Sequence, residues 1–244
     1  MIHPLTNNSG ICLAEVMVAM AAGAVILSAT FQAFTLFESK LTAQQDTISR
    51  HQDQRLGLHV LEEELRLAGT GSPTNSPALS LLGIQEIEFA ANIDDLTTVL
   101  TDPVSALQQD LLVINGSNWH EGKHIVICSA DQCAEGVLAR DGRRTSLSLT
   151  ASLGVAFPAG SEVFVSNRLR YYVGASSGGK KNLMRQVDGG INTIIGDVTH
   201  FQLNYFNRQG QPTSDAASVS RVRIDLAVGH DRQGVVSEVG LRGR

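Results

Sequence analysis

Residues 16–37 form an apolar run without a single formally charged side chain. As an α-helix, these 22 residues would measure about 33 Å, more than the roughly 30 Å hydrocarbon thickness of a bilayer. A secretory signal fits less well, because its apolar region spans about 7–15 residues and follows Lys or Arg, which residues 1–10 lack. A core helix normally has one polar face, whereas this run is apolar on every face. The run therefore predicts a membrane-inserting helix.

Glu15 stands at the start of this run. A carboxylate costs on the order of 2.5–3.5 kcal/mol at the centre of a membrane helix and less near its end, so such a residue marks a candidate functional site. A suitable partner would be a free α-amine four residues upstream in a neighbouring chain. That arrangement requires a new N-terminus at Ile11, produced by cleavage after Gly10.

Gly10, Ile11 and Glu15, followed by the long apolar run, resemble the type IV prepilin signal. The resemblance implies that a membrane aspartyl peptidase, the prepilin peptidase, cuts between Gly10 and Ile11 and methylates the new amine. It also implies that Glu15 meets the N-terminal amine of an adjacent subunit during filament assembly. The chain departs from the usual signal in two respects: Ile11 replaces Phe or Met, and the leader has no Lys or Arg.

The helix is expected to continue beyond Lys40, because the following residues are polar and favour helix. Apolar residues recur at helical spacing and predict one buried stripe: Leu58, Leu61, Leu65 and Ala68. Gly57 is expected to weaken or bend the helix, and Gly69 to end it. The remaining residues of this stretch are interpreted as a solvated charged face: Glu62, Glu63, Glu64 and Arg66.

Beyond Leu81 the sequence changes to short β-like runs separated by Gly, Asn, Asp and Ser. The runs predicted as strands are 111–115, 124–128, 136–139, 146–150, 162–166, 169–173, 183–187, 201–206 and 219–228. The last alternates most clearly, with Val222 and Ile224 on one face and Arg221 and Arg223 on the other. Together the patterns predict an α+β fold in which a long N-terminal helix covers one face of an antiparallel sheet.

Four later stretches extend the resemblance to PilW-type minor pilins and, more distantly, to J-type pseudopilins of type II secretion: residues 59–69, 195–211, 220–228 and 239–244. The implied fold is the type IV pilin fold. The implied organisation is a leader (1–10), a transmembrane and filament-core segment (11–37), an amphipathic continuation (38–69) and a β-rich periplasmic head (70–244).

The implied function is that of a minor pilin which initiates or caps a type IV pilus, or of a minor pseudopilin in type II secretion. Such a chain would sit in the inner membrane as a single-pass protein and later join the pilus or pseudopilus. Its partners would be other minor pilins, the major pilin and the prepilin peptidase. No enzymatic activity and no cofactor are expected.

Cys128 and Cys133 flank a four-residue polar stretch between two strand-like runs. Hairpin geometry would place the two residues opposite each other, within reach of a disulfide in an oxidising compartment. The alternative is a pair of unpaired thiols. A metal site is not expected here, because two further ligands are missing.

His120, Glu121 and His124 match the zinc-peptidase pattern H-E-x-x-H, which requires both histidines on one helix face. The flanking residues instead favour strands and a turn, so a membrane-anchored zinc peptidase is the less favoured alternative. Residues 174–181 approach the P-loop pattern but lack its hydroxyl residue, and a hairpin loop is expected. The net charge of −5 argues against general nucleic-acid binding, although arginines near the C-terminus leave open a small basic face and, with it, a DNA-uptake or adhesin role.

Overall fold

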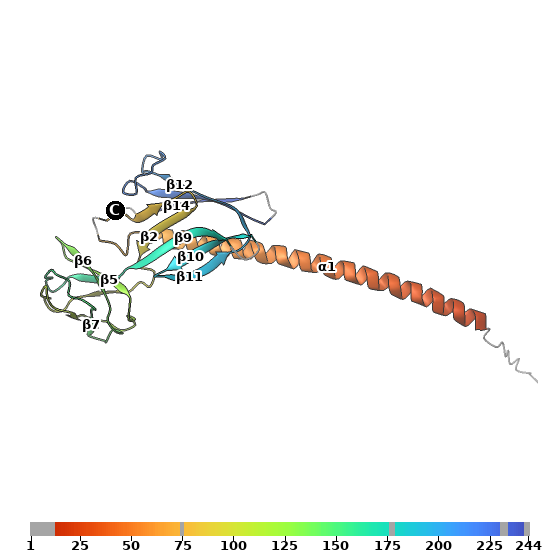
Figure 1. Ribbon diagram of the computed structural model, residues 1–244, viewed down its shortest axis with the longest axis horizontal. Helices are drawn as coiled ribbons and strands as arrows, with labels where there is room; N and C mark the ends of the chain where they lie inside the picture. Colours follow the sequence, from red (N-terminus) through yellow and green to blue (C-terminus); the bar gives the residue numbers. More distant parts are fainter. Residues whose placement is uncertain (1–12, 74–75, 176–178, 230–233, 242–244) are drawn as a thin grey trace, which may run out of the picture. The chain divides into compact units, whose positions relative to one another are not determined.

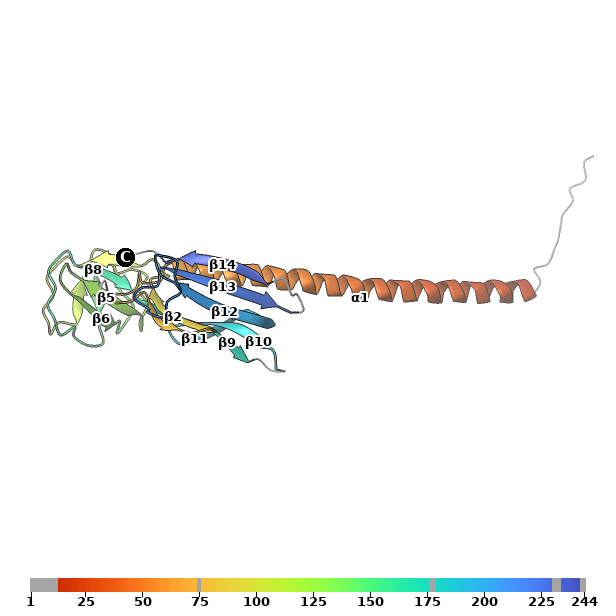
Figure 2. The same cartoon turned by 90° about the horizontal axis from the view of Figure 1, so that it is seen from above.

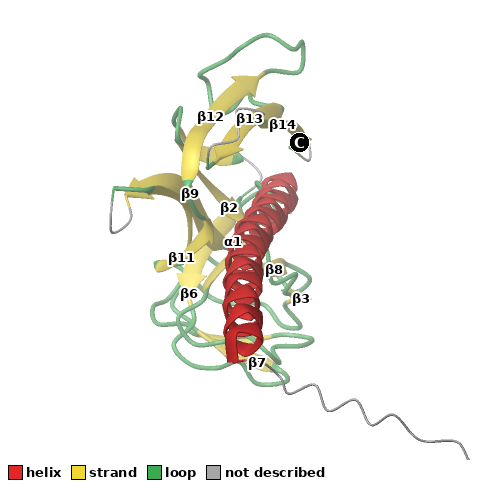
Figure 3. Cartoon of the chain, turned by 90° about the vertical axis from the view of Figure 1, so that its right-hand side faces the viewer, coloured by secondary structure: helices red, strands yellow, loops and turns green. Residues whose placement is uncertain are grey.

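The computed structural model describes residues 13–73, 76–175, 179–229 and 234–241 (Figure 1). The chain forms two compact units, Met1–His51 and Gln52–Arg244. Helix α1 (Leu13–Arg66) runs without interruption over 54 residues and contributes to both units. It is the one helix among the described residues, and the rest of the second unit consists of strands, turns and loops (Figure 3). The predicted α+β class with a long N-terminal helix is confirmed at this level.

The second unit contains a body, defined here as residues 52–93 and 167–241, with two antiparallel sheets (Figures 1 and 2). The first sheet has the order β1-β2-β9-β10-β11, with β1 (Leu79–Leu82), β2 (Glu86–Ala91), β9 (Asn167–Ala175), β10 (Lys181–Val187) and β11 (Gly190–Ile195). The second has the order β12-β13-β14, with β12 (Val198–Phe206), β13 (Arg221–Val228) and β14 (Val235–Gly240). Residues of β13 alternate between exposed or half-buried and buried, as the sequence predicts.

The C-terminal part of α1 packs on these sheets through the stripe that the sequence predicts. Leu58, Leu61, Leu65 and Ala68 are all buried. They join one hydrophobic core with apolar residues of both body sheets, among them Phe89, Leu183, Phe201 and Ile224. The helix ends at Arg66, slightly before the predicted stop. Gly69 follows in a turn with φ of 89°, a conformation that glycine adopts without strain.

Gly57 lies inside α1 and allows a β-strand to approach the helix closely. A Cβ atom at this position would lie 2.3 Å from Cγ1 of Ile195 and 2.9 Å from the backbone oxygen of Ile194. Both distances are shorter than van der Waals contact. The absence of a side chain at Gly57 is therefore what allows the close approach of β11, and α1 continues through this position to Arg66.

Residues 94–166 form a separate lobe, inserted between the paired strands β2 and β9. Its strands make a four-stranded antiparallel sheet and a two-stranded one: β3 (Thr97–Val99), β4 (Asp110–Leu112), β5 (His124–Cys128), β6 (Cys133–Val137), β7 (Ser146–Ser148) and β8 (Glu162–Val165). The lobe has its own hydrophobic core around Trp119, Leu111, Ile125 and Phe157. The sequence predicts one sheet covered by the helix, and the structure corrects this: the lobe strands enclose a core to which α1 contributes no residue.

Candidate functional site

The N-terminal part of α1 exposes a long apolar surface. Leu13–Thr42 is long and apolar enough to cross a membrane, and none of its most apolar stretch is buried in the chain itself. Large apolar side chains are exposed on all sides of it, among them Met17, Val25, Leu27, Phe31 and Phe37. Each gains roughly 1.5–3 kcal/mol on burial, so this segment requires lipid or other protein around it.

The hydroxyl groups of this segment are satisfied by the helix itself. Ser28 donates a hydrogen bond to the carbonyl oxygen of Val25 (2.8 Å), and Thr30 donates to that of Ile26 (2.8 Å). Thr35 donates to the carbonyl oxygen of Gln32 (2.9 Å). Buried or lipid-facing hydroxyls are costly unless they are hydrogen-bonded, so these side chains are compatible with an apolar environment.

Glu15 is the one charged side chain between Leu13 and Phe37, and it lies in the first turn of α1 as the structure describes it. Its carboxylate makes no ion pair or hydrogen bond within the described residues. Together with Ala14, Val18, Ala19 and Ala22 it lines a shallow, mostly small-residue recess on this side of the helix. Small residues of this kind let a second helix approach closely. The predicted processing residues, Gly10 and Ile11, lie outside the described residues.

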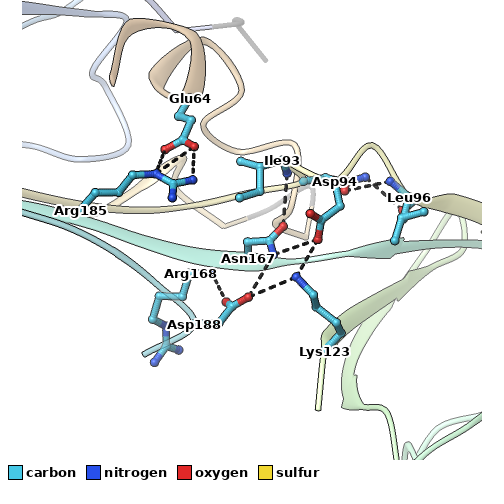
Figure 4. Close-up of polar contacts among 10 residues, drawn as sticks. Glu64, Ile93, Asp94, Leu96, Lys123, Asn167, Arg168, Arg185 and Asp188 are labelled. Atoms are coloured by element: carbon cyan, nitrogen blue, oxygen red, sulfur yellow. Dashed lines mark hydrogen bonds and ion pairs between the residues drawn. The ribbon is translucent and has the colours of Figure 1, made fainter. Parts of the chain in front are cut away.

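Glu64 is not part of a solvated face, which corrects the interpretation of this residue from sequence. Its side chain is 11% exposed and accepts hydrogen bonds from Nε of Arg185 at 3.1 and 2.9 Å (Figure 4). It also accepts a hydrogen bond from the hydroxyl of Tyr171. The hydrogen bond to Glu64 raises the pKa of Arg185. Burial, followed by the charge of Glu64, raises the pKa of Tyr171. Arg185 therefore stays charged and Tyr171 stays protonated near neutral pH, and the hydrogen bonds of Glu64 to both join α1 to β9 and β10.

A second polar cluster, called the neck here, lies where the chain passes between body and lobe: Asp94, Lys123, Asn167 and Asp188 (Figure 4). Asn167 is fully buried and donates to Oδ2 of Asp94 (3.3 Å) and Oδ2 of Asp188 (3.0 Å). Nζ of Lys123 lies 2.7 Å from Oδ2 of Asp94 and 3.7 Å from Oδ2 of Asp188. The sequence showed no pattern for this cluster, since its members are far apart in the chain.

The charges of the neck act on Asp94. Partial burial of this carboxyl raises its pKa, but the hydrogen bonds from Lys123 and Asn167 and the positive charge of Lys123 together outweigh that effect. The net result is a pKa below the ordinary value of 3.8. Asp94 is therefore ionised at neutral pH, and Lys123 is bound between two acidic side chains.

A groove of about 500 Å³ lies between the body and the lobe beside the neck. The lobe contributes His124, Val126 and Glu135, and the body contributes Glu88 and Arg168 together with residues of the segment before β1. Arg168 is 79% exposed and sits 3.8 Å from Glu88, so its charge is mostly available to solvent. The groove is open and its walls are mixed in charge, which does not define one class of ligand.

Cys128 and Cys133 are directly opposed in the β5–β6 hairpin and are joined by a disulfide, with 4.1 Å between their Cα atoms. The four residues between them form the predicted turn, in which the backbone N–H of Ser129 donates to the carbonyl oxygen of Gln132 (2.8 Å). The bond closes the end of this hairpin in the lobe.

The zinc-peptidase pattern lacks the geometry that its chemistry requires. His120 and Glu121 lie in a turn, and His124 is the first residue of β5, so the two histidines do not share a helix face. Among the described residues no group of three or more His, Cys, Asp or Glu side chains is placed to hold a metal ion. The P-loop-like stretch connects β9 to β10, and the strand that follows takes the place of the helix which a P-loop needs.

Two features therefore carry functional information: an exposed apolar helix segment with a single carboxylate, and a β-rich unit built around the end of the same helix. No protein-family model, no curated protein and no solved structure matches the chain. The function is inferred from these two features and from the prepilin-like residues that precede them.

Proposed function

We propose that the chain is a minor pilin that takes part in type IV pilus assembly through subunit contacts and not through catalysis. The observation that supports this proposal most strongly is the difference between the two parts of α1. Its N-terminal part exposes apolar side chains on every face, whereas its C-terminal part is built into the core of a β-rich head. A helix of this kind needs lipid around it before assembly and neighbouring helices after it.

Glu15 would give this helix a defined register against its neighbours. Before assembly the apolar helices gain little from contact with each other, because lipid is as apolar as their side chains. One ion pair in a medium of low dielectric can then decide which subunits pair and in which alignment. The recess lined by Ala14, Val18, Ala19 and Ala22 supports this role, because it lets a neighbouring N-terminus come close to the carboxylate.

The remaining parts of the proposal concern processing and location. Cleavage between Gly10 and Ile11 would create the amine that Glu15 requires. The protein would then span the inner membrane once, with its head in the periplasm. The Cys128–Cys133 disulfide supports this placement, since such bonds persist in the oxidising periplasm and are rare in the cytosol.

A minor pseudopilin of type II secretion would use the same helix and the same carboxylate. The two assignments differ in the machine that fails when the protein is absent. Loss of surface pili after deletion supports the proposal, whereas intact pili with failed secretion of exported proteins would reassign the chain to the secretion system.

Glu15→Ala is expected to reduce incorporation of the protein into filaments, and its co-purification with other pilins, at least tenfold. The substitution leaves the neighbouring N-terminal amine without a counter-charge in an apolar environment. Quantitative immunoblots of sheared filaments and of detergent-solubilised complexes measure the effect. Glu38→Ala is the control, because Glu38 is an exposed acid on the same helix outside the apolar run. Unchanged incorporation of the Glu15 variant would contradict the pairing role.

A further inference from the structure

The lobe and the body meet with little shared structure. Their hydrophobic cores have no residue in common. The chain crosses between the two modules twice. At the first crossing Ile93 packs on the body core and Leu96 on the lobe core, and at the second Val165 belongs to the lobe core and Leu169 to the body core. In the described residues no strand of the lobe pairs with a strand of the body. Two modules with separate cores can change their relative orientation without unpacking either one.

The two chain crossings lie side by side. Ala91 and Asn167 are partners in the β2–β9 ladder, and the backbone N–H of Val165 donates to the carbonyl oxygen of Leu96 (3.1 Å) just inside the lobe. Asn92 adds hydrogen bonds to both backbone groups of Leu96. Two adjacent, hydrogen-bonded crossings fix the position of the lobe but act as an axis about which it can rotate.

Lys123 adds a contact between lobe and body beside these crossings, to the same oxygen of Asp188 to which Asn167 donates at 3.0 Å. It precedes β5, and its ammonium group reaches Asp188, which belongs to the tight turn between β10 and β11 in the body. The N–H of Arg168 donates to the other oxygen of Asp188 (2.8 Å) and holds that carboxylate in place. The ion pair is 3.7 Å long and its two side chains are 24% and 25% exposed, so it is a breakable restraint and not a buried one.

We propose that residues 94–166 form a hinged lobe that rotates about the two crossings, and that the Lys123–Asp188 pair holds it in the orientation seen here. Rotation changes the width of the groove, whose walls come from the two modules. The lobe also carries exposed apolar side chains, including Leu107 (85% exposed) and Ile114 (66%).

Lys123→Met tests the hinge, because it keeps an unbranched side chain of nearly the same length and removes its charge. Spin labels at Leu107→Cys in the lobe and Gln209→Cys in the body, in full-length protein with Cys12→Ala in detergent, report the distance distribution between the two modules. We expect the distribution to become at least twice as broad as in the parent. Lys180→Met is the matched control, since Lys180 pairs with Asp197 within the body at 3.4 Å, and it should leave the width unchanged.

Hydrogen exchange on the same variants separates rotation from unfolding. Amides of β5 in the lobe and β13 in the body should keep their protection in Lys123→Met. An unchanged distance distribution would overturn the proposal. A broad distribution accompanied by lost protection in β5 or β13 would also overturn it, because the module would then be melting and not rotating.

Discussion

Replacement of Glu64 by Ala is expected to lower the free energy of unfolding of the head by about 3–5 kcal/mol. The substitution removes the acceptor of Arg185 and Tyr171 and leaves a guanidinium that is 21% exposed without its counter-charge. It also removes part of the joint between α1 and the strands β9 and β10. Hydrogen exchange of the slowest amides of β9 and β10, in full-length protein in detergent, measures the change.

Glu63→Ala is the matched control for this experiment. Glu63 is the neighbouring acid, its side chain is 52% exposed, and its ion pair is with Arg66 on the same helix. Such an exposed pair contributes little, so the free energy of unfolding should change by less than about 1 kcal/mol. Equal effects of the two substitutions would show that Glu64 acts as a solvated charge after all.

Gly57→Val is expected to lower the free energy of unfolding by about 3 kcal/mol. Helix propensity alone predicts the opposite sign, because glycine is the least favourable residue in a helix apart from proline. The contact with β11 decides the outcome: the added carbon atoms collide with Ile195 and with the backbone of Ile194, so the helix and the strand must separate. The same exchange measurement applies, read at β10 and β13.

Leu56→Val introduces the same side chain one position earlier, where the native residue is 65% exposed. That control measures the intrinsic effect of valine on the helix, which amounts to a few tenths of a kcal/mol. A Gly57 variant as stable as this control would mean that α1 and β11 are less tightly packed than the structure shows.

The burial of Gly57 and Glu64 follows from their helical spacing relative to the leucines. Gly57 lies four positions before Leu61, and Glu64 lies three positions after Leu61. Both therefore lie on the buried helix face that the leucines define. Helical spacing alone therefore indicated burial for both. It could not indicate the partners, because Arg185 is 121 residues away in sequence and comes close only when the sheet forms.

The β-rich part was predictable in pieces but not as a whole. Alternation identified β13, and the polar turn between two apolar runs identified the β5–β6 hairpin. β11 was missed, although the Asp188–Gly189 pair before it is a strong hairpin-turn signal. The separate lobe had no local signal, since β2 pairs with β9 across an insertion whose own strands follow the same pattern as those of the body.

The most direct test of the proposed function is the mass of the N-terminal peptide of the protein isolated from its native membranes. The proposal predicts a chain that begins at Ile11 and carries one methyl group on its α-amine. Such an N-terminus supplies the partner that Glu15 lacks within the described residues. A mature protein that still begins at Met1 would contradict the assignment to the type IV pilin class.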